Sequence, residues 1–284
     1  MDSRDPALAA RFAAYLDRWS LTLDGEPITT ATNFLLPVRY VGTPSIVKIA
    51  TEEEERRGAA TMVWWAGEGA ARVLAHDDDA LLMERAAGER SLAEMAHAGQ
   101  DDEATRILCA AAARLHAPRS RALPPSLVPL SQWFRELAPA AARYGGILAQ
   151  AAAMAGALLA DQQDIVVLHG DIHHGNALDF GPRGWLTIDP KGLLGERTFD
   201  FVNILRNPEE ETALTPGRFA HQVAVIVDAA VVERVRLLQW TLAFTGLSAA
   251  WILNDGDEPT LDLAIAELAR AELAAGNAMT GNER

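Results

Sequence analysis

The sequence lacks the features that define several large classes of protein. Its single cysteine, Cys109, excludes an internal disulfide framework and a zinc site built from several cysteines. The longest uncharged runs, 144–160 and 237–253, have 17 residues each, fewer than the roughly 20 that a membrane-spanning helix needs. We therefore expect buried helices there and no membrane partner. Residues 1–6 carry mixed charge without an apolar stretch, so we expect no secretory signal and a cytoplasmic protein.

Positive charge is scarce as well. The chain has 25 Lys and Arg against 39 Asp and Glu, which gives a net charge of −14. Nucleic-acid binding needs clustered cations to neutralise phosphates, so we expect no nucleic-acid partner. A negative field attracts cations, which makes a small cationic molecule a candidate ligand, although solubility alone explains the same excess of acids. We expect a monomer.

The first 85 residues mix helical and β patterns. Apolar residues at helical spacing predict a helix within residues 1–20, and a turn signal at 42–44 predicts a β-hairpin over 34–49. Thr51 is a good N-cap for a helix that begins with four glutamates and ends at Gly67. Two further strands are expected at 73–74 and 80–83.

Helical patterns dominate after Gly88, with one β interruption. A strand is expected at 165–168 and a hairpin over 177–188. These observations predict an α+β fold of two lobes, a small β-rich lobe over residues 1–85 and a larger, mainly helical lobe over 86–284. The helices expected in the larger lobe are 101–116, 131–160, 217–236, 237–253 and 260–275.

The most specific segment is a polar loop, residues 169–176, with the sequence His-Gly-Asp-Ile-His-His-Gly-Asn. It holds Asp171 and Asn176, five residues apart, and the following hairpin returns the chain to Asp189. Two oxygen ligands and one further carboxylate suit a hard cation together with a general base. In phosphoryl transfer an Asp accepts the hydroxyl proton, and an Asn five positions later and an Asp in the next loop hold the metal. The spacing therefore indicates a kinase.

The polar loop resembles the catalytic loop of aminoglycoside phosphotransferases and related small-molecule kinases with a protein-kinase-like fold. The longer string from 168 to 192 is similar to the branch that contains streptomycin 6-phosphotransferases and hydroxyurea phosphotransferases. Residues 34–38 and 81–85 resemble the same branch, and the likeness extends from about residue 28 to 255. The resemblance implies ATP as phosphoryl donor and Mg²⁺ as metal.

The same resemblance implies a role for individual residues. Asp171 would be the catalytic base, and Asn176 and Asp189 the metal ligands. Lys48, which stands in an apolar strand, would contact the ATP phosphates, and a plain surface lysine is the alternative. A glutamate of the next helix would pair with Lys48. Many relatives of the wider family carry this Glu about where the chain has Gly58; Glu55 lies three residues earlier and is favoured, and Glu54, on the same helix face as Gly58, is the alternative.

Two further segments would contact the nucleotide. No Gly-rich phosphate loop precedes Lys48; Thr32 and Asn33 stand where one would be, and their hydroxyl and backbone N–H groups could cover phosphates. Met83 and Glu84 would form the hinge whose backbone binds adenine, with a simple strand end as the alternative. By the same resemblance, Asp200 would be a buried acid that supports the polar loop.

The histidines of the polar loop have simpler interpretations than metal binding. His169 and His173 are four residues apart, which on a helix could bind zinc. The glycines at 170 and 175 interrupt any helix, so we expect His169 to hold the loop through backbone hydrogen bonds. His173 and His174 are expected to be loop polar residues, with substrate contact as the alternative.

The sequence thus predicts an ATP-dependent kinase of a small, cationic hydroxylated molecule, with a streptomycin-type aminoglycoside as the favoured acceptor and antibiotic resistance as the role. Two alternatives remain. One is a kinase of the same fold that acts on hydroxyurea, a sugar or an amino alcohol. The other is an inactive nucleotide-binding module, against which the joint presence of Lys48, Asp171, Asn176 and Asp189 argues. The sequence does not separate ATP from GTP.

Overall fold

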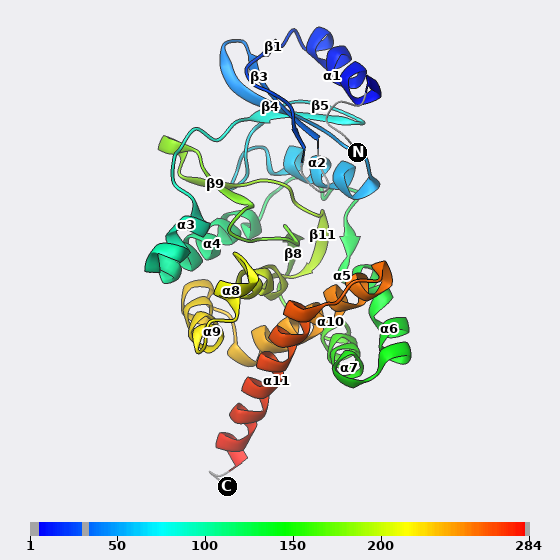
Figure 1. The fold of residues 1–284 in the computed structure, drawn as a ribbon, viewed down its shortest axis with the longest axis vertical. Coiled ribbons are helices and arrows are strands. Elements are labelled where there is room, and N and C mark those ends of the chain that lie inside the picture. The colour runs from blue at the N-terminus through cyan, green and yellow to red at the C-terminus, as the bar shows by residue number, and fades with distance from the viewer. Residues whose placement is uncertain (1–5, 30–33, 282–284) are drawn as a thin grey trace.

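The computed structural model describes residues 6–29 and 34–281, and Figure 1 shows their arrangement. The helices are α1 (Pro6–Arg18), α2 (Glu53–Trp65), α3 (Leu92–Met95), α4 (Asp101–His116), α5 (Leu130–Trp133), α6 (Leu137–Tyr144), α7 (Gly146–Ala160), α8 (Glu210–Ala213), α9 (Arg218–Ala230), α10 (Arg234–Asp255) and α11 (Thr260–Gly281). The strands are β1 (Thr22–Leu23), β2 (Ile28–Thr29), β3 (Phe34–Tyr40), β4 (Thr43–Ile49), β5 (Val73–Asp77), β6 (Ala80–Glu84), β7 (Val128–Pro129), β8 (Ile165–Leu168), β9 (Ala177–Asp179), β10 (Trp185–Thr187) and β11 (Leu193–Glu196). A π-helical turn spans Ala96–Gln100, and 3-10 helices span Phe134–Glu136, Gly181–Arg183 and Arg197–Arg206.

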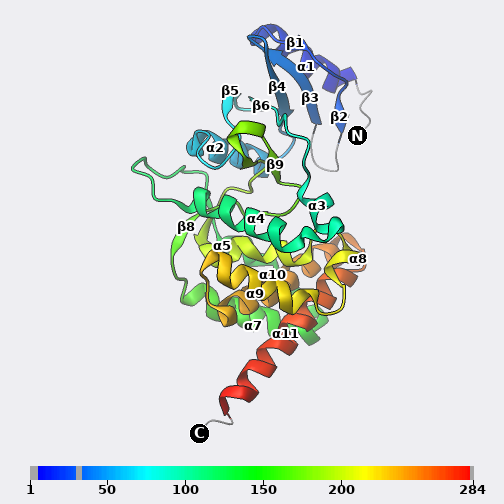
Figure 2. The ribbon, with the colours of Figure 1, turned by 90° about the vertical axis from the view of Figure 1, so that its left-hand side faces the viewer.

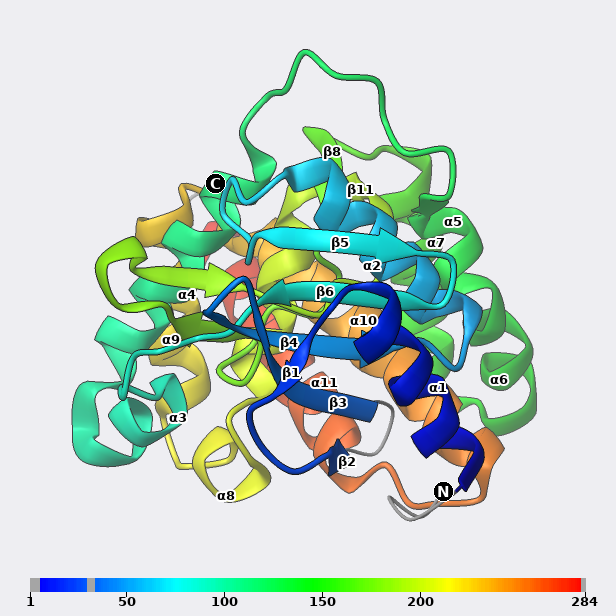
Figure 3. The same ribbon diagram turned by 90° about the horizontal axis from the view of Figure 1, so that it is seen from above.

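A six-stranded antiparallel sheet forms the N-terminal part. Its order is β1-β3-β4-β6-β5, with β2 also pairing with β3, and Figure 3 shows the central strands side by side. The predicted hairpin is confirmed as β3 and β4, with Leu35 opposite Lys48. Helix α1 lies against one face of the sheet, where Phe12 packs with Val47, and α2 lies on the side of the helical part.

Strand alternation determines which way Lys48 faces. Side chains of neighbouring strand residues point to opposite faces. Val47 and Ile49 belong to the cluster that packs under α1, whereas Ile46 packs against the larger core that includes Met62 of α2. Lys48 therefore points toward α2 and the helical part.

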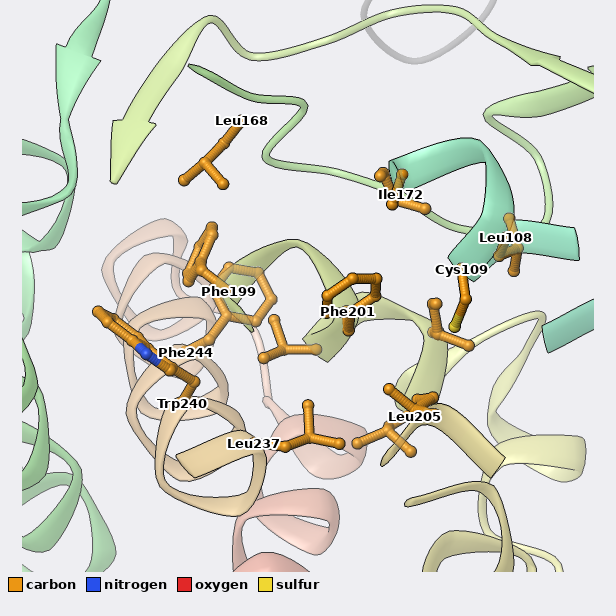
Figure 4. Packing of buried hydrophobic residues seen from close by; sticks show 14 of the residues in the cluster. Leu108, Cys109, Leu168, Ile172, Phe199, Phe201, Leu205, Leu237, Trp240 and Phe244 are labelled. Atoms are coloured by element: carbon orange, nitrogen blue, oxygen red, sulfur yellow. The ribbon is translucent and has the colours of Figure 1, made fainter. Parts of the chain in front are cut away.

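The core of the helical part is built around α10. Figure 4 shows the rings of Phe199, Trp240 and Phe244 packed together. The Phe199 ring centroid is 5.7 Å from that of Trp240 and 5.3 Å from that of Phe244. This packing places the 3-10 helix Arg197–Arg206 on α10 and fixes its position next to strand β8. Among the described residues, no helix has the length and apolar character needed to cross a membrane.

The β9–β10 hairpin connects the two parts of the molecule. Thr187 donates its backbone N–H to the carbonyl of Gly69 at 3.0 Å and accepts from the N–H of Ala71 at 2.9 Å. Arg183, at the turn of the hairpin, donates to the carbonyl of Gly67 at 2.9 Å and contacts Glu84 of β6. Figure 2 shows the hairpin between the sheet and α4. The two lobes expected from the sequence are thus visible, and the boundary at residues 85/86 remains a prediction.

Several of the predicted helix limits differ from the structure; α11, for example, extends to Gly281 and not to residue 275. The expected helix over 131–160 is broken, because Gly145 and Gly146 adopt φ values of 64° and 57° that end one helix and start another. The break expected at 236/237 lies instead at 231–233, where Val231 has a φ of 50°. Thr51 is not the N-cap of α2; Glu52 occupies that position without a side-chain cap bond.

Helices α7 and α10 pack closely at one glycine and leave open space at another. A Cβ at Gly246 of α10 would lie 2.2 Å from the Cβ of Ala151 in α7, whereas one at Gly156 of α7 would meet nothing within 4 Å. We expect Gly246→Ala to lower the free energy of unfolding by about 1–2 kcal/mol, because overpacking outweighs the better helix propensity of alanine. The control Gly156→Ala should raise it by about 0.5–1 kcal/mol. Urea denaturation measures both, and shifts of the same sign would contradict this packing.

Candidate active site

The polar loop is held in place by Asp200 of the 3-10 helix Arg197–Arg206. Asp200 accepts hydrogen bonds from the backbone N–H groups of His169 at 2.9 Å and Gly170 at 2.7 Å. The ring of His116 in α4 donates to the same carboxylate at 2.7 Å. Asp200 is buried, so these donors replace the water that it loses. The structural role expected for Asp200 is confirmed.

His169 connects the loop to the segment that follows the hairpin. Its Nε2–H donates to the carbonyl of Ile188 at 2.8 Å, and its Nδ1 accepts from the N–H of Asp171 at 3.2 Å. Burial lowers the pKa of His169, which keeps the ring neutral and suited to both bonds. The expected backbone-binding role is confirmed. No cluster of three or more His, Cys, Asp or Glu side chains able to hold a metal occurs in the described part of the chain.

The other two histidines differ in position. His173 lines the cavity described below, and its Nδ1 accepts from the N–H of Gly175 at 3.0 Å. His174 is 3% exposed, and neither ring nitrogen has a hydrogen-bond partner among the described residues. Burial, reinforced by Arg218, lowers the pKa of His174 to about 4, so the ring is neutral. Of the two, His173 is the one placed to meet a bound molecule.

Asp171 is oriented by two amide side chains. Asn203 donates from Nδ2 to Oδ1 of Asp171 at 2.9 Å, and Asn176 donates from Nδ2 to the backbone carbonyl of Asp171 at 2.9 Å. A longer bond of 3.3 Å joins Asn176 to Oδ2. Asn203 is buried and was not singled out from the sequence, although an asparagine among the apolar residues of 201–205 is a signal that could have found it.

Asn176 and Asp189 are brought together by the hairpin between them. The N–H of Ile188 donates to the carbonyl of Asn176 at 2.9 Å, which places Asp189 next to this residue. Asn176 uses its Nδ2 on Asp171, so its amide oxygen is the atom left for a cation. Amide and carboxylate oxygens are the donors that Mg²⁺ prefers, and it usually takes its remaining ligands from water and phosphates. The donor set therefore fits Mg²⁺ held jointly with a nucleotide.

Lys48 forms an ion pair with Asp189. The two residues are 141 positions apart in sequence, and the Lys48 side chain is 10% exposed. Burial alone would raise the pKa of Asp189, but the ammonium of Lys48 outweighs it, so the pKa lies below its usual value. The carboxylate that could hold a metal is thus ionised and faces the cation of the sheet.

The structure pairs the glutamates of α2 differently from the expectation. Glu55 does not pair with Lys48 here. Its Oε2 accepts from the N–H of Thr51 at 2.5 Å, and its Oε1 is buried without a partner among the described residues. Glu54 binds Nζ of Lys191 at 2.9 Å. Lys48 already has Asp189 as its counter-ion, which removes the need for either glutamate; nucleotide contact by Glu55 remains a prediction.

The expected hinge residues lie at the edge of the same site. Met83 pairs with Ile46 across the sheet, and the N–H of Glu84 donates to the carbonyl of Arg72 at 3.0 Å. The Glu84 side chain accepts from the N–H of Arg72 at 2.5 Å. Thr32 and Asn33, expected to cover phosphates, lie outside the described residues.

A cavity of about 660 Å³ lies between the sheet, α2 and the polar loop. Apolar side chains such as Leu35, Met62 and Leu178 form much of its wall. Its lining brings together all the expected site residues that the structure describes, namely Lys48, Glu55, Met83, Glu84, Asp171, Asn176 and Asp189. A cavity with an apolar wall and a few convergent charges has the form of a small-molecule site.

The comparisons with known proteins agree with this geometry. The sequence profile of the aminoglycoside/hydroxyurea antibiotic resistance kinase family matches residues 18–256. The chain is 50% identical to a streptomycin 3''-kinase of Klebsiella pneumoniae over 264 residues, 90% of this chain and 98% of the relative. It is 30% identical to a streptomycin 6-kinase of Streptomyces griseus, over 88% of this chain and 84% of the relative.

The fold is similar to that of solved kinases. An aminoglycoside phosphotransferase from Streptomyces rimosus superposes with a TM-score of 0.61 at 19% identity, over 85% of this chain and 98% of that chain. A choline kinase from Streptococcus pneumoniae gives 0.60 at 13% identity, over 95% of this chain and 99% of that one. The protein-kinase-like fold is thus confirmed, and the chain belongs to the aminoglycoside/hydroxyurea antibiotic resistance kinase family.

Proposed function

We propose that this protein transfers the γ-phosphoryl group of ATP to a hydroxyl of streptomycin and thereby inactivates the antibiotic. The observation that supports the kinase activity most strongly is the convergence of Lys48, Asp171, Asn176 and Asp189 on one cavity. These residues come from the sheet, the polar loop and the segment after the hairpin, and a family member that had lost catalysis would not need to keep all four. We propose the cytoplasm, where ATP is available, as the location.

The chain's residues divide the work of the transfer. Asp171 orients the acceptor hydroxyl and accepts its proton as the hydroxyl oxygen bonds to the γ-phosphorus. The bond between that phosphorus and the β,γ-bridging oxygen breaks, and ADP leaves with the electron pair. Lys48 neutralises phosphate charge. Asn176 and Asp189 would hold Mg²⁺, which would supply further positive charge against the phosphates. Met83 and Glu84 flank the adenine, and Thr32, Asn33 and Glu55 are proposed to border the phosphates.

The choice of acceptor is supported by the relatives. The 50% identity to a 3''-kinase against 30% to a 6-kinase favours the 3''-hydroxyl of streptomycin over the 6-hydroxyl. The Streptomyces rimosus enzyme has been solved in complex with ADP and streptomycin. Streptomycin carries guanidinium groups, and the net charge of −14 would favour such a cation.

Hydroxyurea is the second candidate acceptor. A hydroxyurea phosphotransferase of Kitasatospora aureofaciens is 29% identical to this chain, over 92% of this chain and 78% of the relative. Hydroxyurea is small and uncharged, so it would gain nothing from the acidic field. The two acceptors can therefore be separated by direct comparison and by the effect of salt.

The role of Asp171 predicts how two variants differ. Asp171→Asn keeps the size but cannot accept a proton, so kcat should fall by about 10²–10⁴. Asn203→Ala removes the donor that orients Asp171 and should lower kcat by about 10–10², with the KM for ATP nearly unchanged. The exposed Asp228→Asn on α9 is the control and should keep wild-type turnover. Turnover by Asp171→Asn within twofold of wild type would rule out Asp171 as the base.

The proposed metal ligands predict unequal effects. Asp189 supplies a negative charge and Asn176 a neutral oxygen, so Asp189→Ala should weaken binding of Mg²⁺–ADP more than Asn176→Ala does. Calorimetric titration with ADP in the presence and absence of Mg²⁺ measures this difference. Both variants binding Mg²⁺–ADP like the wild type would exclude this metal site.

The acceptor is tested with a panel that contains streptomycin, other aminoglycosides and hydroxyurea. We expect ATP-dependent phosphorylation of streptomycin at the 3''-hydroxyl, located by mass spectrometry and two-dimensional phosphorus–proton NMR. We also expect kcat/KM to fall as salt increases, because the Debye length shrinks below about 10 Å above 0.1 M. Turnover of hydroxyurea but not of streptomycin would refute the acceptor. A kcat/KM independent of salt would remove the electrostatic argument for it.

A further inference from the structure

Lysine is nearly absent from this protein. Of its 25 basic residues, 23 are arginines and two are lysines, Lys48 and Lys191. Both lysines line the 660 Å³ cavity. Ion pairs elsewhere in the described chain use arginine or histidine, such as Arg218 with Asp101 and Arg236 with Glu196. A lysine differs from an arginine in carrying a compact charge on a flexible stem. The site thus contains a type of side chain that the rest of the molecule does not use.

The backbone of Lys191 is rigidly placed. Its N–H donates to the carbonyl of His169 at 2.7 Å, which ties it to the polar loop. Gly170 has a φ of 83°, and a Cβ there would lie 3.0 Å from the Cβ of Lys191, so the two segments are in close contact. The position from which the side chain reaches into the cavity is thereby fixed.

The ammonium group of Lys191 lies between two carboxylates. Nζ is 2.9 Å from Oε1 of Glu54 and 3.9 Å from Oδ2 of Asp171. The side chain therefore places a cation beside the proposed base.

We propose that Lys191 is a second phosphate-binding cation. During the reaction its ammonium group separates from Glu54 and contacts the transferred phosphoryl group. The proposal rests on the function proposed above. The acceptor hydroxyl lies within about 3 Å of Asp171, and the γ-phosphorus lies about 3–3.5 Å from the acceptor oxygen. The γ-phosphoryl oxygens then come within reach of an ammonium group that is already 3.9 Å from Oδ2 of Asp171. A cation aimed at the charge of the transferring group is the interaction that lowers this barrier.

A purely structural role for Lys191 fits the contacts less well. Helix α2 already lies directly on the segment that carries Lys191, because a Cβ at Gly58 would be 2.2 Å from the carbonyl oxygen of Pro190 and one at Gly192 would be 3.1 Å from that of Arg57. Asp171 is already oriented by Asn203 and Asn176. Neither α2 nor Asp171 therefore needs Lys191 to hold it in place. A phosphoryl group next to Asp171, in contrast, has no other lysine at that end of the site.

The scarcity of lysine allows a direct test on the wild-type protein. After incorporation of lysine labelled with ¹³C and ¹⁵N, the side-chain NMR spectrum contains two lysines, assigned with Lys48→Arg and Lys191→Arg. We expect Mg²⁺–ADP to shift mainly Lys48, and the β,γ-imido analogue of ATP to shift Lys191 in addition. A shift of Lys48 without any response of Lys191 to the triphosphate would overturn the proposal and leave the proposed function intact. No response of Lys48 to either nucleotide would overturn the proposed nucleotide site, and the proposal with it.

Kinetics separates phosphate contact from support of α2. Lys191→Met should lower kcat by about 10²–10³ while the KM for ATP changes less than fivefold, because the contact forms with the transferring group. Glu54→Gln breaks the same ion pair but keeps the cation, and should lower kcat less than tenfold. Thermal unfolding of both variants checks that they fold. Equal losses of kcat in the two variants would show that Lys191 acts through α2 and would refute the proposal.

Discussion

The hydrogen bonds that Asp200 accepts are the interaction on which the rest of the site depends. One buried carboxylate fixes two consecutive N–H groups of the polar loop and is itself held by His116. Its own helix is anchored by the packing of Phe199 on Trp240 and Phe244. The position of Asp171 is therefore set by the hydrophobic core of the helical part. A substitution deep in that core would shift the carboxylate of Asp200 and, through it, the position of Asp171.

Charge balance follows from this placement. Five titratable groups meet in a small volume, with Lys48 facing Asp189 and Lys191 lying between Glu54 and Asp171. Each cation is compensated before a nucleotide arrives, which avoids burying an unpaired charge. Binding of a polyphosphate and its metal then exchanges partners within the set. Glu54, once separated from Lys191, has a side chain that is 34% exposed and can be solvated by water. An arrangement of this kind favours a preorganised site over one assembled by large side-chain movements.

The sequence predicted the elements of the site whose evidence is local. Asp171, Asn176 and Asp189 could be found because a fixed spacing around one hairpin carries them. The sheet hairpin could be found because alternation and a Gly-containing turn are short-range signals. The pairing of Lys48 with Asp189 could not, since it joins residues 141 positions apart through the packing of two parts. The break at Gly145–Gly146 was present in the sequence as a glycine pair, but the alanine-rich flanks concealed it. The cap of α2 was assigned to Thr51 by propensity, and the Glu55 carboxylate that reaches back to the Thr51 N–H replaced that arrangement.

The attachment of the β9–β10 hairpin has a consequence for motion. Besides the covalent connection after β6, the hairpin is bonded to residues 67–71 on one side and, through Asp179 and the N–H of Gly88 at 2.9 Å, to that connection on the other. Two parts joined along one edge by several attachments move relative to each other by a hinge rotation about that edge. They swing about a single axis along that edge and resist twisting and sliding. Hinge rotation of the two parts would thus widen the cavity on the side opposite the hairpin, while the edge near Glu84 stays closed.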